Sequence, residues 1–589
     1  MTATRLREVD AVVIGMGWAG SIVARELTRA GMEVVGLERG GDQTPGDNFT
    51  VPAIRDELRY AQRQELIQDP AVETVTFRNT DSEVALPVRR FGAFLPGSGV
   101  GGGGTHWAGQ HWRFLPSDLR IRSHLTERYG ARAVPSELTL RDWGVSYEEL
   151  ESDYDRFEKL CGVSGKAGNL RGALIAGGNV FEGARSAQYP NAPLRQCRAG
   201  ERFEAAASEL GCHPFPVPAS NASAAYTNPE GLTLGPCQYC GFCGRYGCES
   251  NAKASPNTTL MPVLRASKNF SLRTHAFATR LLYRQADRRV TGVVYTDLRT
   301  GKEFEQPAQI VVLAAFVFSN TRLLLLSGIG RPYDARSGKG VVGRSYCYQN
   351  ETHLPMLFED EHFNPFMSAG AMGTAIDDFN GDNFDHAGLG FFGGGFICCT
   401  NSSSTPIGAR TLPPGTPRWG HEWKKSAAHW YTRSATLIVE GSGYPARRNY
   451  LDLDPTYRDR LGLPLLRMTY DITGNDRKMS RYLSDTAVRI ARQMRLTHLL
   501  TPDYRDGKFG VVAYQSSHNA GGTVMGSDPD ESAVNRHLQS WNAHNLFIVG
   551  ASVFPHQPGY NPTGTVGALA FRAARSITRD YVRRPDFLA

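Results

Sequence analysis

The sequence has few of the features that mark membrane-spanning, nucleic-acid-binding or disulfide-rich proteins. No apolar run approaches the roughly 18–20 residues of a membrane-spanning helix, and the best candidate, residues 310–318, is soon followed by Asn320 and Arg322. The chain has no block of lysine and arginine, and its net charge of +7 is small for 589 residues, so nucleic acid is not an expected partner. Ten cysteines are too few for a disulfide scaffold at this length.

Two further absences concern export and haem. The first ten residues lack the apolar core and the cleavage site of a signal peptide, and no C-x-x-C-H motif for haem attachment occurs. We therefore expect no export signal or membrane anchor on this chain, and any haem on another polypeptide. The content of 41% hydrophobic and 21% charged residues is typical of a globular protein, and the length indicates about two to four domains.

A dinucleotide-binding unit is predicted near the N-terminus. Residues 10–15 form a continuously apolar segment typical of a buried parallel strand, residues 21–30 are predicted to be helical, and residues 33–38 form a second strand. This order of strand, helix and strand is the βαβ unit that binds dinucleotides.

The turns of this unit carry the residues that such a site needs. Gly15, Gly17 and Gly20 have the spacing G-x-G-x-x-G, which allows a tight turn, close approach of a pyrophosphate and close packing of the helix. Glu38 ends the second strand, where an acid binds the ribose 2′-hydroxyl. The glycine spacing alone is weak, but a purely structural glycine turn would leave Glu38 unexplained. We therefore predict a true dinucleotide site.

A second glycine-rich segment spans residues 92–109. So many glycines indicate backbone pressed against a large, flat ligand. The alternative, a flexible linker, would not carry His106, Trp107 and Trp112.

Four of the cysteines lie in one short run, at Cys237, Cys240, Cys243 and Cys248. The C-x-x-C-x-x-C spacing resembles that of ferredoxin iron–sulfur runs and favours a cluster. A structural zinc site usually uses two separated C-x-x-C pairs, and a disulfide within the run would be cramped. Near the run, Lys253 and Arg245 are interpreted either as counter-charges of a cluster or as ordinary surface cations.

The rest of the chain alternates between predicted strands and helices. Strands are expected at residues 309–315, within 437–472 and at 545–550, and helices at 319–327, 478–495 and 564–581. Strands typical of a dinucleotide-binding domain thus occur near both ends of the chain. We therefore expect a first domain that the C-terminal segment completes, and a second, sheet-based domain between its two parts.

Together these motifs resemble the glucose-methanol-choline (GMC) oxidoreductase family over essentially the whole chain. The resemblance rests on the glycine fingerprint with Glu38, on the loop 97–104 and on Ser327-Gly-Ile-Gly330. The C-terminal part adds Ser517-His518, Gly521-Gly522, Val549-Gly-Ala-Ser552 and Asn561-Pro-Thr-Gly564. Phe316 and Ser319-Asn320 stand where the family usually has a small residue and Ser-Pro, so the local packing is expected to differ there.

The resemblance implies an α/β fold, α+β overall, with a Rossmann-like FAD-binding domain of GMC type and an interleaved substrate domain built on an antiparallel sheet. We expect the FAD-binding domain to span residues 1–345, with insertions from about residue 116 and an iron–sulfur segment at about 232–255. Residues 346–507 would then form the substrate-binding domain. Residues 508–589 would complete the FAD domain and carry the catalytic histidine.

The resemblance also implies FAD as the cofactor. The residues expected to bind it are Gly15, Gly17, Gly20, Glu38, Gly99, Gly103, Thr105, His106, Ala278, Gly550, Ala551, Asn561, Pro562 and Thr563. In some members of the family a Thr-His-Trp sequence carries the flavin through a histidyl bond, and Thr105-His106-Trp107 matches it. A covalent bond to His106 is the favoured interpretation, and a non-covalent neighbour of the flavin is the alternative.

Oxidation of a secondary alcohol needs a base for the hydroxyl proton and an acceptor for the hydride, and the resemblance places the base at His518. A neutral imidazole accepts such a proton near pH 7. Asn561 matches the second position of the family's site, where an amide holds the substrate hydroxyl. The alternative for His518 is a structural histidine. The helix that opens at Asn561-Pro-Thr-Gly564 would aim its N-terminus at the flavin and stabilise the anionic reduced form.

Within the family, the cysteine run and the Thr-His-Trp sequence are most similar to the flavoprotein subunits of membrane-bound sugar and sugar-acid dehydrogenases. This implies oxidation of a secondary hydroxyl of a sugar acid, D-gluconate to 2-dehydro-D-gluconate, with fructose, sorbitol or 2-ketogluconate as alternative substrates. Electrons would leave FAD through an iron–sulfur cluster held by Cys237, Cys240, Cys243 and Cys248. The favoured cluster has three irons and four sulfides and needs three thiolates, so one of the four would be spare.

The same resemblance implies partner subunits. A multihaem cytochrome c subunit would receive the electrons and pass them to quinone. A small subunit with an export signal would bring this chain to the periplasm, where it would meet the inner membrane only through its partners.

Two other functions remain as alternatives. A GMC oxidase that reduces oxygen would have no use for the cysteine run, and an electron-transfer subunit without a substrate site would have no use for His518 and Asn561. The favoured hypothesis is therefore an FAD-dependent dehydrogenase whose acceptor is neither NAD nor oxygen.

Overall fold

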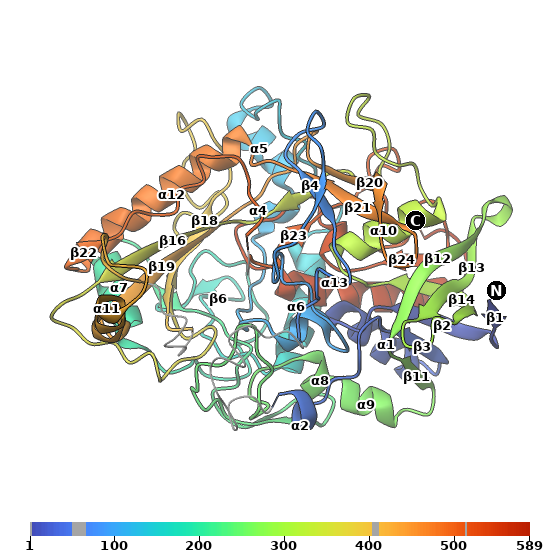
Figure 1. The fold of residues 1–589 in the computed structure, drawn as a ribbon, viewed down its shortest axis with the longest axis horizontal. Coiled ribbons are helices and arrows are strands. Elements are labelled where there is room, and N and C mark those ends of the chain that lie inside the picture. The colour runs from blue at the N-terminus through green and yellow to red at the C-terminus, as the bar shows by residue number, and fades with distance from the viewer. Residues whose placement is uncertain (1–2, 50–65, 403–410, 513–514, 589) are drawn as a thin grey trace.

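The computed structural model describes residues 3–49, 66–402, 411–512 and 515–588. An eight-stranded sheet carries the predicted dinucleotide-binding unit, and both ends of the chain lie on the side of this sheet (Figure 1). Five strands run parallel, in the order β11-β3-β2-β14-β24, while β13 and β12 continue antiparallel from the first half of β14, which also pairs with β1. The bounds are Thr4–Arg5 for β1, Val9–Ile14 for β2, Val34–Leu37 for β3, Phe270–Arg273 for β11, Ala276–Arg284 for β12, Arg289–Asp297 for β13, Glu303–Leu313 for β14 and Leu546–Ile548 for β24.

The strand β2 shows why this part of the sequence forms a buried parallel sheet. Five of its six residues are buried, and β3 and β14 flank it on either side. Helix α1 (Trp18–Arg29) packs on β2 and β3 and also against helix α13 (Thr563–Arg575). A continuously apolar strand of this kind is stable only in a sheet that is covered on both faces.

The turn from β2 to α1 depends on two glycines. Gly15 has a φ of +92°, a left-handed conformation that residues with a side chain rarely adopt. A Cβ on Gly20 would lie 1.9 Å from the carbonyl oxygen of Gly15. The turn is therefore tight enough to place the N-terminus of α1 directly at the end of β2.

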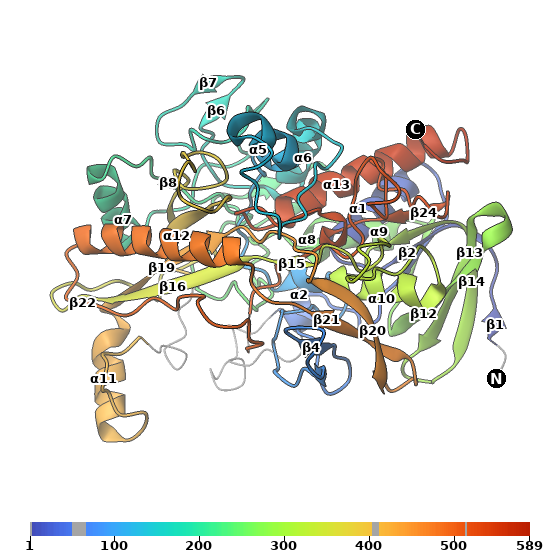
Figure 2. The same ribbon diagram turned by 90° about the horizontal axis from the view of Figure 1, so that it is seen from above.

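A second sheet, of six antiparallel strands, lies at the other end of the molecule from the first (Figure 2). Its order is β22-β16-β19-β18-β17-β8, and helices α12 and α7 cover one of its faces. The side chain of Thr473 caps the start of α12 by accepting a hydrogen bond from the backbone of Asp476 at 3.0 Å. The bounds are Phe215–Pro216 for β8, Asn350–Leu357 for β16, Gly373–Ile376 for β17, Gly395–Thr400 for β18, Ser434–Gly441 for β19, His498–Leu499 for β22, Arg198–Glu209 for α7 and Gly474–Gln493 for α12.

The strands β20 (Tyr450–Arg458) and β21 (Pro464–Thr469) differ from the expectation for residues 437–472. They do not join the second sheet but form a four-stranded sheet with β4 (Thr76–Arg78) and β5 (Leu86–Pro87). Alternating polarity predicts a strand but does not predict which other strand it pairs with. Here Arg78 and Thr469, on the two paired strands, stand 391 residues apart in the sequence.

Shorter elements connect these sheets. They are α2 Pro45–Asn48, α4 Pro116–Leu119, α5 Ile121–Tyr129, α6 Tyr147–Cys161, α8 Pro256–Thr259, α9 Met261–Ala266, α10 Val317–Ser327, α11 His421–Tyr431 and the strand pairs β6 Asn169–Leu170 with β7 Ala173–Leu174, β9 Tyr226–Thr227 with β10 Thr233–Leu234, and β15 Cys347–Tyr348 with β23 Asn519–Ala520. The last helix, α13, ends at Arg575 and continues as a π-helical turn, Ser576–Tyr581.

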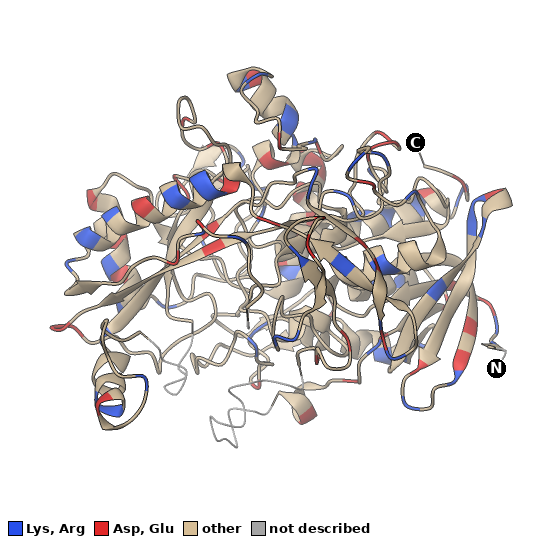
Figure 3. Ribbon diagram, turned by 45° about the horizontal axis from the view of Figure 1, so that its top comes forward, with Lys and Arg blue, Asp and Glu red and all other residues tan. Residues whose placement is uncertain are grey.

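The architecture agrees with the predicted fold class. A mostly parallel sheet and an interleaved antiparallel sheet are both present, and β24 near the C-terminus pairs with β14 of the N-terminal sheet. The residue limits of the domains stay a prediction. In the part of the chain that the structure describes, no helix is long and apolar enough to cross a membrane. Lysines and arginines are interspersed with aspartates and glutamates over the sheets and helices that the structure describes (Figure 3).

Candidate active site

A cavity of about 1570 Å³, partly open to solvent, lies at the carboxyl ends of β2, β3 and β14. Open α/β sheets bind their ligands at this edge. The predicted residues that line it are Gly15, Gly17, Glu38, Gly103, Ala278, Gly550, Ala551, Pro562 and Thr563.

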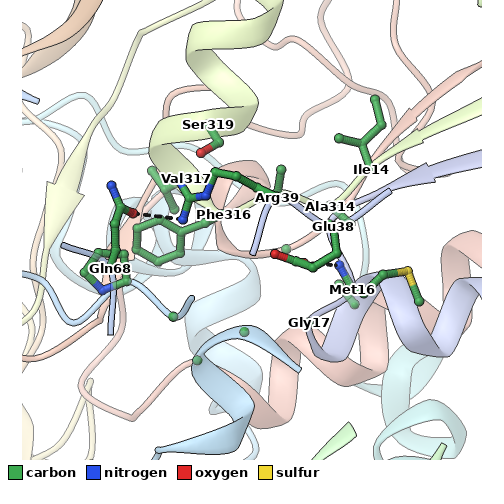
Figure 4. A pocket seen from close by; sticks show the side chains of 18 of the residues that line it. Ile14, Met16, Gly17, Glu38, Arg39, Gln68, Ala314, Phe316, Val317 and Ser319 are labelled. Atoms are coloured by element: carbon green, nitrogen blue, oxygen red, sulfur yellow. Dashed lines mark hydrogen bonds between the residues drawn. The ribbon is translucent and has the colours of Figure 1, made fainter. Parts of the chain in front are cut away.

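Glu38 lies directly after β3, at the cavity wall (Figure 4). Its carboxylate accepts hydrogen bonds from the backbone N–H groups of Met16, at 3.1 Å, and Gly40, at 2.9 Å. These bonds fix the carboxylate and leave it lone pairs for a ribose hydroxyl. Beside it, Arg39 donates to the Gln68 side chain at 3.1 Å, next to the ring of Phe316.

Three glycines of the wall border open space. A Cβ on Gly17 would meet only the carbonyl oxygen of Gly101, at 3.8 Å, and a Cβ on Gly103 or Gly550 would meet no atom within 4 Å. Helix α1 begins directly after Gly17 and has no side-chain cap, so its first N–H groups are available to a pyrophosphate. The cavity therefore has room for a dinucleotide where its phosphates need close backbone approach.

Five residues predicted to bind FAD are not among those that line the cavity: Asn561, which is described with His518 below, and four residues of the loops behind the wall. Gly20 packs against the turn at Gly15, and Gly99, with a φ of +96°, faces the carbonyl of Gly41. Thr105 donates a hydrogen bond to the carbonyl of Gly102 at 2.9 Å. These side chains and glycines shape the loops behind the wall, and His106 is the fourth.

His106 is buried within the glycine loop, which we define as residues 97–107. Burial first, and then the charges of Lys253 and Arg245, lower the pKa of His106 to about 4, so the ring is neutral at pH 7. Its Nε2 has no hydrogen-bond partner among the described residues. A neutral nitrogen of this kind is chemically able to bond to a flavin, but Trp107 rather than His106 reaches the cavity wall.

His518 and Asn561 meet at the edge of the cavity, next to Ser517 and Pro562, which line it. The Nδ2 of Asn561 lies 3.3 Å from the Nε2 of His518 and donates a hydrogen bond to Oε2 of Glu440 at 2.9 Å. The same carboxyl oxygen lies 3.6 Å from the Nδ1 of His518. The structure thus brings the predicted pair together and adds Glu440, which the sequence analysis missed.

The pKa of Glu440 differs from that of a surface carboxylate. Burial, and then the charge of Glu351 directly opposite it in β16, raise the pKa of Glu440 to about 8. Burial lowers the pKa of His518 to about 4. Both groups are therefore neutral at pH 7, and a neutral imidazole is the form that accepts a proton.

One feature of the sequence points to Glu440. It is the single acid in the apolar strand segment Leu437-Ile-Val-Glu-Gly441 of β19. Burying a carboxyl group is costly, so an acid in such a strand indicates a functional contact.

Helix α13 directs its N-terminus at the cavity. It begins at Thr563, and Pro562, Thr563 and Val566 line the wall. Its first turn contains no acidic residue, so no side-chain charge offsets the partial positive charge of the helix end.

The cysteine run packs against the glycine loop, where the backbone N–H of Arg245 donates to the carbonyl of His106 at 2.5 Å. The side chain of Asn221 donates to the sulfur of Cys243 at 3.5 Å, and the backbone N–H of Lys253 donates to the sulfur of Cys248 at 3.3 Å. Such donors are typical around the thiolate ligands of iron–sulfur clusters.

Among the described residues, no three His, Cys, Asp or Glu side chains surround a single metal position. The thiolates of a cluster bind different iron ions, so the predicted cluster does not require that arrangement, and it stays a prediction. Lys253 is fully buried, so its interpretation as a surface cation was wrong.

Comparisons with known proteins agree with this geometry. Residues 225–349 and 445–570 match two family models described as GMC oxidoreductase. The chain is 43% identical to the gluconate 2-dehydrogenase flavoprotein of Pantoea cypripedii, over 99% of this chain and 95% of that protein. The chain belongs to the GMC oxidoreductase family. This GMC oxidoreductase is also 24% identical to the fructose dehydrogenase large subunit of Gluconobacter japonicus, over 97% and 98% of the two chains.

Two solved structures share the fold of this GMC oxidoreductase. Pyridoxine 4-oxidase from Mesorbium loti superposes with a TM-score of 0.58 at 17% identity, over 97% of this chain and 99% of that one. Formate oxidase from Aspergillus oryzae RIB40 superposes with a TM-score of 0.59 at 14% identity, over 99% of both chains.

Membership of this family implies FAD as the cofactor, and the cavity fits it. Glu38 and the N-terminus of α1 would hold the ribose and the pyrophosphate of its ADP half. The N-terminus of α13 and the neighbouring His518 lie at the end of the cavity that would receive the flavin ring.

Replacing Gly17 by alanine tests the phosphate cradle. Its φ of −79° is accessible to alanine, and the new methyl group would approach no protein atom closer than 3.8 Å. We therefore expect an unchanged melting temperature of the flavin-free protein but an FAD affinity at least ~10-fold lower, because the methyl group occupies space that the pyrophosphate needs. Flavin content and FAD titration measure this. The matched control is Gly46→Ala, where an added Cβ meets no atom within 4 Å and lies outside the cavity. An FAD affinity of Gly17→Ala equal to that of the wild type would show that Gly17 does not border the pyrophosphate.

Replacing Glu440 by glutamine tests its coupling to His518. Above about pH 8 the wild-type carboxyl group is ionised, and its charge, 3.6 Å from the Nδ1 of His518, stabilises the protonated ring. We expect the rate of flavin reduction to rise as the pH passes about 8 in the wild type, and Glu440→Gln to lose this step. Stopped-flow measurements across the pH range check it. Glu351→Gln removes the charge that raises the pKa of Glu440, so its step should move to lower pH. A step that persists in Glu440→Gln belongs to another group.

Proposed function

We propose that this GMC oxidoreductase is an FAD-dependent dehydrogenase that oxidises the C2 hydroxyl of D-gluconate to 2-dehydro-D-gluconate. The observation that carries the proposal is 43% identity to the gluconate 2-dehydrogenase flavoprotein over nearly the whole of both chains. The relatives named 2-methyl-1,2-propanediol dehydrogenase and fructose dehydrogenase large subunit are 27% and 24% identical. The neutral base and the amide at the cavity edge supply the chemistry that the reaction needs.

Each side chain at the cavity edge has a separate role in the proposed reaction. FAD, when bound, would supply the acceptor for the hydride of the carbinol carbon. The Nε2 of His518 takes the hydroxyl proton. The Oδ1 of Asn561 has no hydrogen-bond partner among the described residues and can accept a hydrogen bond from a substrate hydroxyl other than the one that loses its proton. Glu440 holds the amide in this orientation through its 2.9 Å hydrogen bond.

The cysteine run is the proposed exit for the electrons. A cluster of three irons and four sulfides on three of Cys237, Cys240, Cys243 and Cys248 would pass electrons singly to a multihaem cytochrome c subunit and on to quinone. Contact between the run and the glycine loop, through Arg245 and His106, supports this route because it shortens the path from the flavin.

A complex in the periplasm follows from the same proposal. A small subunit with an export signal would carry this chain across the inner membrane, and the membrane would be met only through partner subunits. The relative named fructose dehydrogenase large subunit supports a multisubunit assembly.

We also propose that FAD is bound covalently through His106. The unpartnered Nε2 of this buried, neutral ring supports the bond. Protein precipitated with acid should keep its yellow fluorescence, and His106→Ala should lose it while keeping non-covalent FAD. Release of all flavin from the wild type on denaturation would disprove the bond.

The substrate is tested by bleaching of the bound flavin without oxygen. Gluconate should reduce the flavin of the purified chain, and His518→Ala should slow this at least ~100-fold because the general base is lost. The rate with fructose, sorbitol and 2-ketogluconate is measured in parallel. Bleaching by one of these sugars and none by gluconate would contradict the proposed substrate, and rapid peroxide formation in air would identify an oxidase instead.

A further inference from the structure

Lys253 is a buried cation at the contact between the cysteine run and the glycine loop. Its side chain is fully buried. Its Nζ donates hydrogen bonds to the carbonyl oxygens of Trp107 at 2.6 Å, Cys243 at 2.7 Å and Tyr246 at 2.7 Å. These bonds occupy all three donors of an ammonium group.

The surroundings of the Lys253 ammonium group differ from those of a buried cation that is paired with a carboxylate. The buried guanidinium of Arg113 forms an ion pair with the buried Glu158 at 2.8 Å. In the described part of the chain, the ionisable groups that act on Lys253 are instead the thiols of Cys243, Cys248 and Cys240. Carbonyl oxygens satisfy its hydrogen bonds but carry no net charge, and a buried charge needs compensation. These thiols would provide the negative charge as thiolates bound to a cluster.

Lys253 also ties the two segments together. Its Nζ bridges Trp107 of the glycine loop and Cys243 of the run, while its own backbone N–H reaches the sulfur of Cys248 at 3.3 Å. One residue further on, the carbonyl of Ala254 accepts a hydrogen bond from the indole Nε1 of Trp107 at 2.8 Å. Trp107 lines the cavity, so the cation stands between the predicted flavin site and the predicted cluster.

We propose that Lys253 is the built-in counter-ion of the iron–sulfur cluster, and that it raises the cluster's reduction potential while fixing the cysteine run to the glycine loop. The inference rests on the cluster of the proposed function. When the cluster accepts one electron from the reduced flavin, its net charge becomes more negative by one. A fixed cation beside it stabilises that reduced form. Lys253 is thus a positioning and redox-tuning residue.

The test is a redox titration of the cluster, followed by EPR, in full-length holoenzyme. Lys253→Met removes the charge and keeps the length of the side chain. We expect the ratio of reduced to oxidised cluster at a given potential to fall at least tenfold, which is about 59 mV for one electron. Lys253→Arg keeps the charge, so the reduction potential of its cluster should differ from that of the wild type by less than about 59 mV. Lys268→Met, at an exposed lysine, is the matched control and should leave the potential unchanged.

The outcomes separate this inference from the proposed function. If the wild-type protein contains flavin but no iron or sulfide, the proposed electron transfer through a cluster is wrong, and this inference is wrong with it. Wild-type protein with a cluster, together with an unshifted potential in Lys253→Met, overturns only the role of Lys253 as counter-ion. If Lys253→Met is isolated without iron, the Lys253→Arg variant shows whether the cluster needs the positive charge or only the carbonyl contacts of the side chain. Iron retained in the arginine variant supports the need for charge, and a folded but iron-free arginine variant shows that only the carbonyl contacts matter.

Discussion

The position of β14 between β2 and β24 is the constraint on which the site depends. Parallel pairing aligns the carboxyl ends of the three strands at one edge of the sheet. The turn at Gly15 after β2 and the segment at Gly550 after β24 therefore open on the same cavity, although more than five hundred residues separate them. Helix α13, which follows β24, packs on α1 and presents its N-terminus to that cavity.

Two buried regions near this cavity differ in the charge that they enclose. At the proposed hydride-transfer end, burial keeps His518 and Glu440 neutral at pH 7, so a proton can move without a fixed charge opposing it. At the cysteine run, burial encloses Lys253, whose Nζ contacts three carbonyl oxygens and whose charge the proposed cluster would balance. The proposed proton transfer and the proposed electron transfer would thus take place in separate surroundings within one fold.

Local patterns in the sequence predicted the parts of the site that a short segment builds by itself. The glycine fingerprint with Glu38, the strand and helix around it, and the helix start after Asn561 all depend on neighbouring residues. The pairing of β21 with β4 and the place of Glu440 beside Asn561 were not predicted, because each joins segments that are distant in the sequence. Lys253 was identified, but its burial was not, because nothing local distinguishes it from a surface lysine.

The sequence by itself determined the dinucleotide-binding unit, the family resemblance and the types of residue available for catalysis and metal binding. Only the tertiary structure decided which of them meet: Glu440 with His518 and Asn561, and Lys253 with the glycine loop and the cysteine run. The physical reason is that the chemical state of an ionisable side chain depends on its burial and its charged neighbours. Both are set by long-range packing rather than by the residues beside it in the chain.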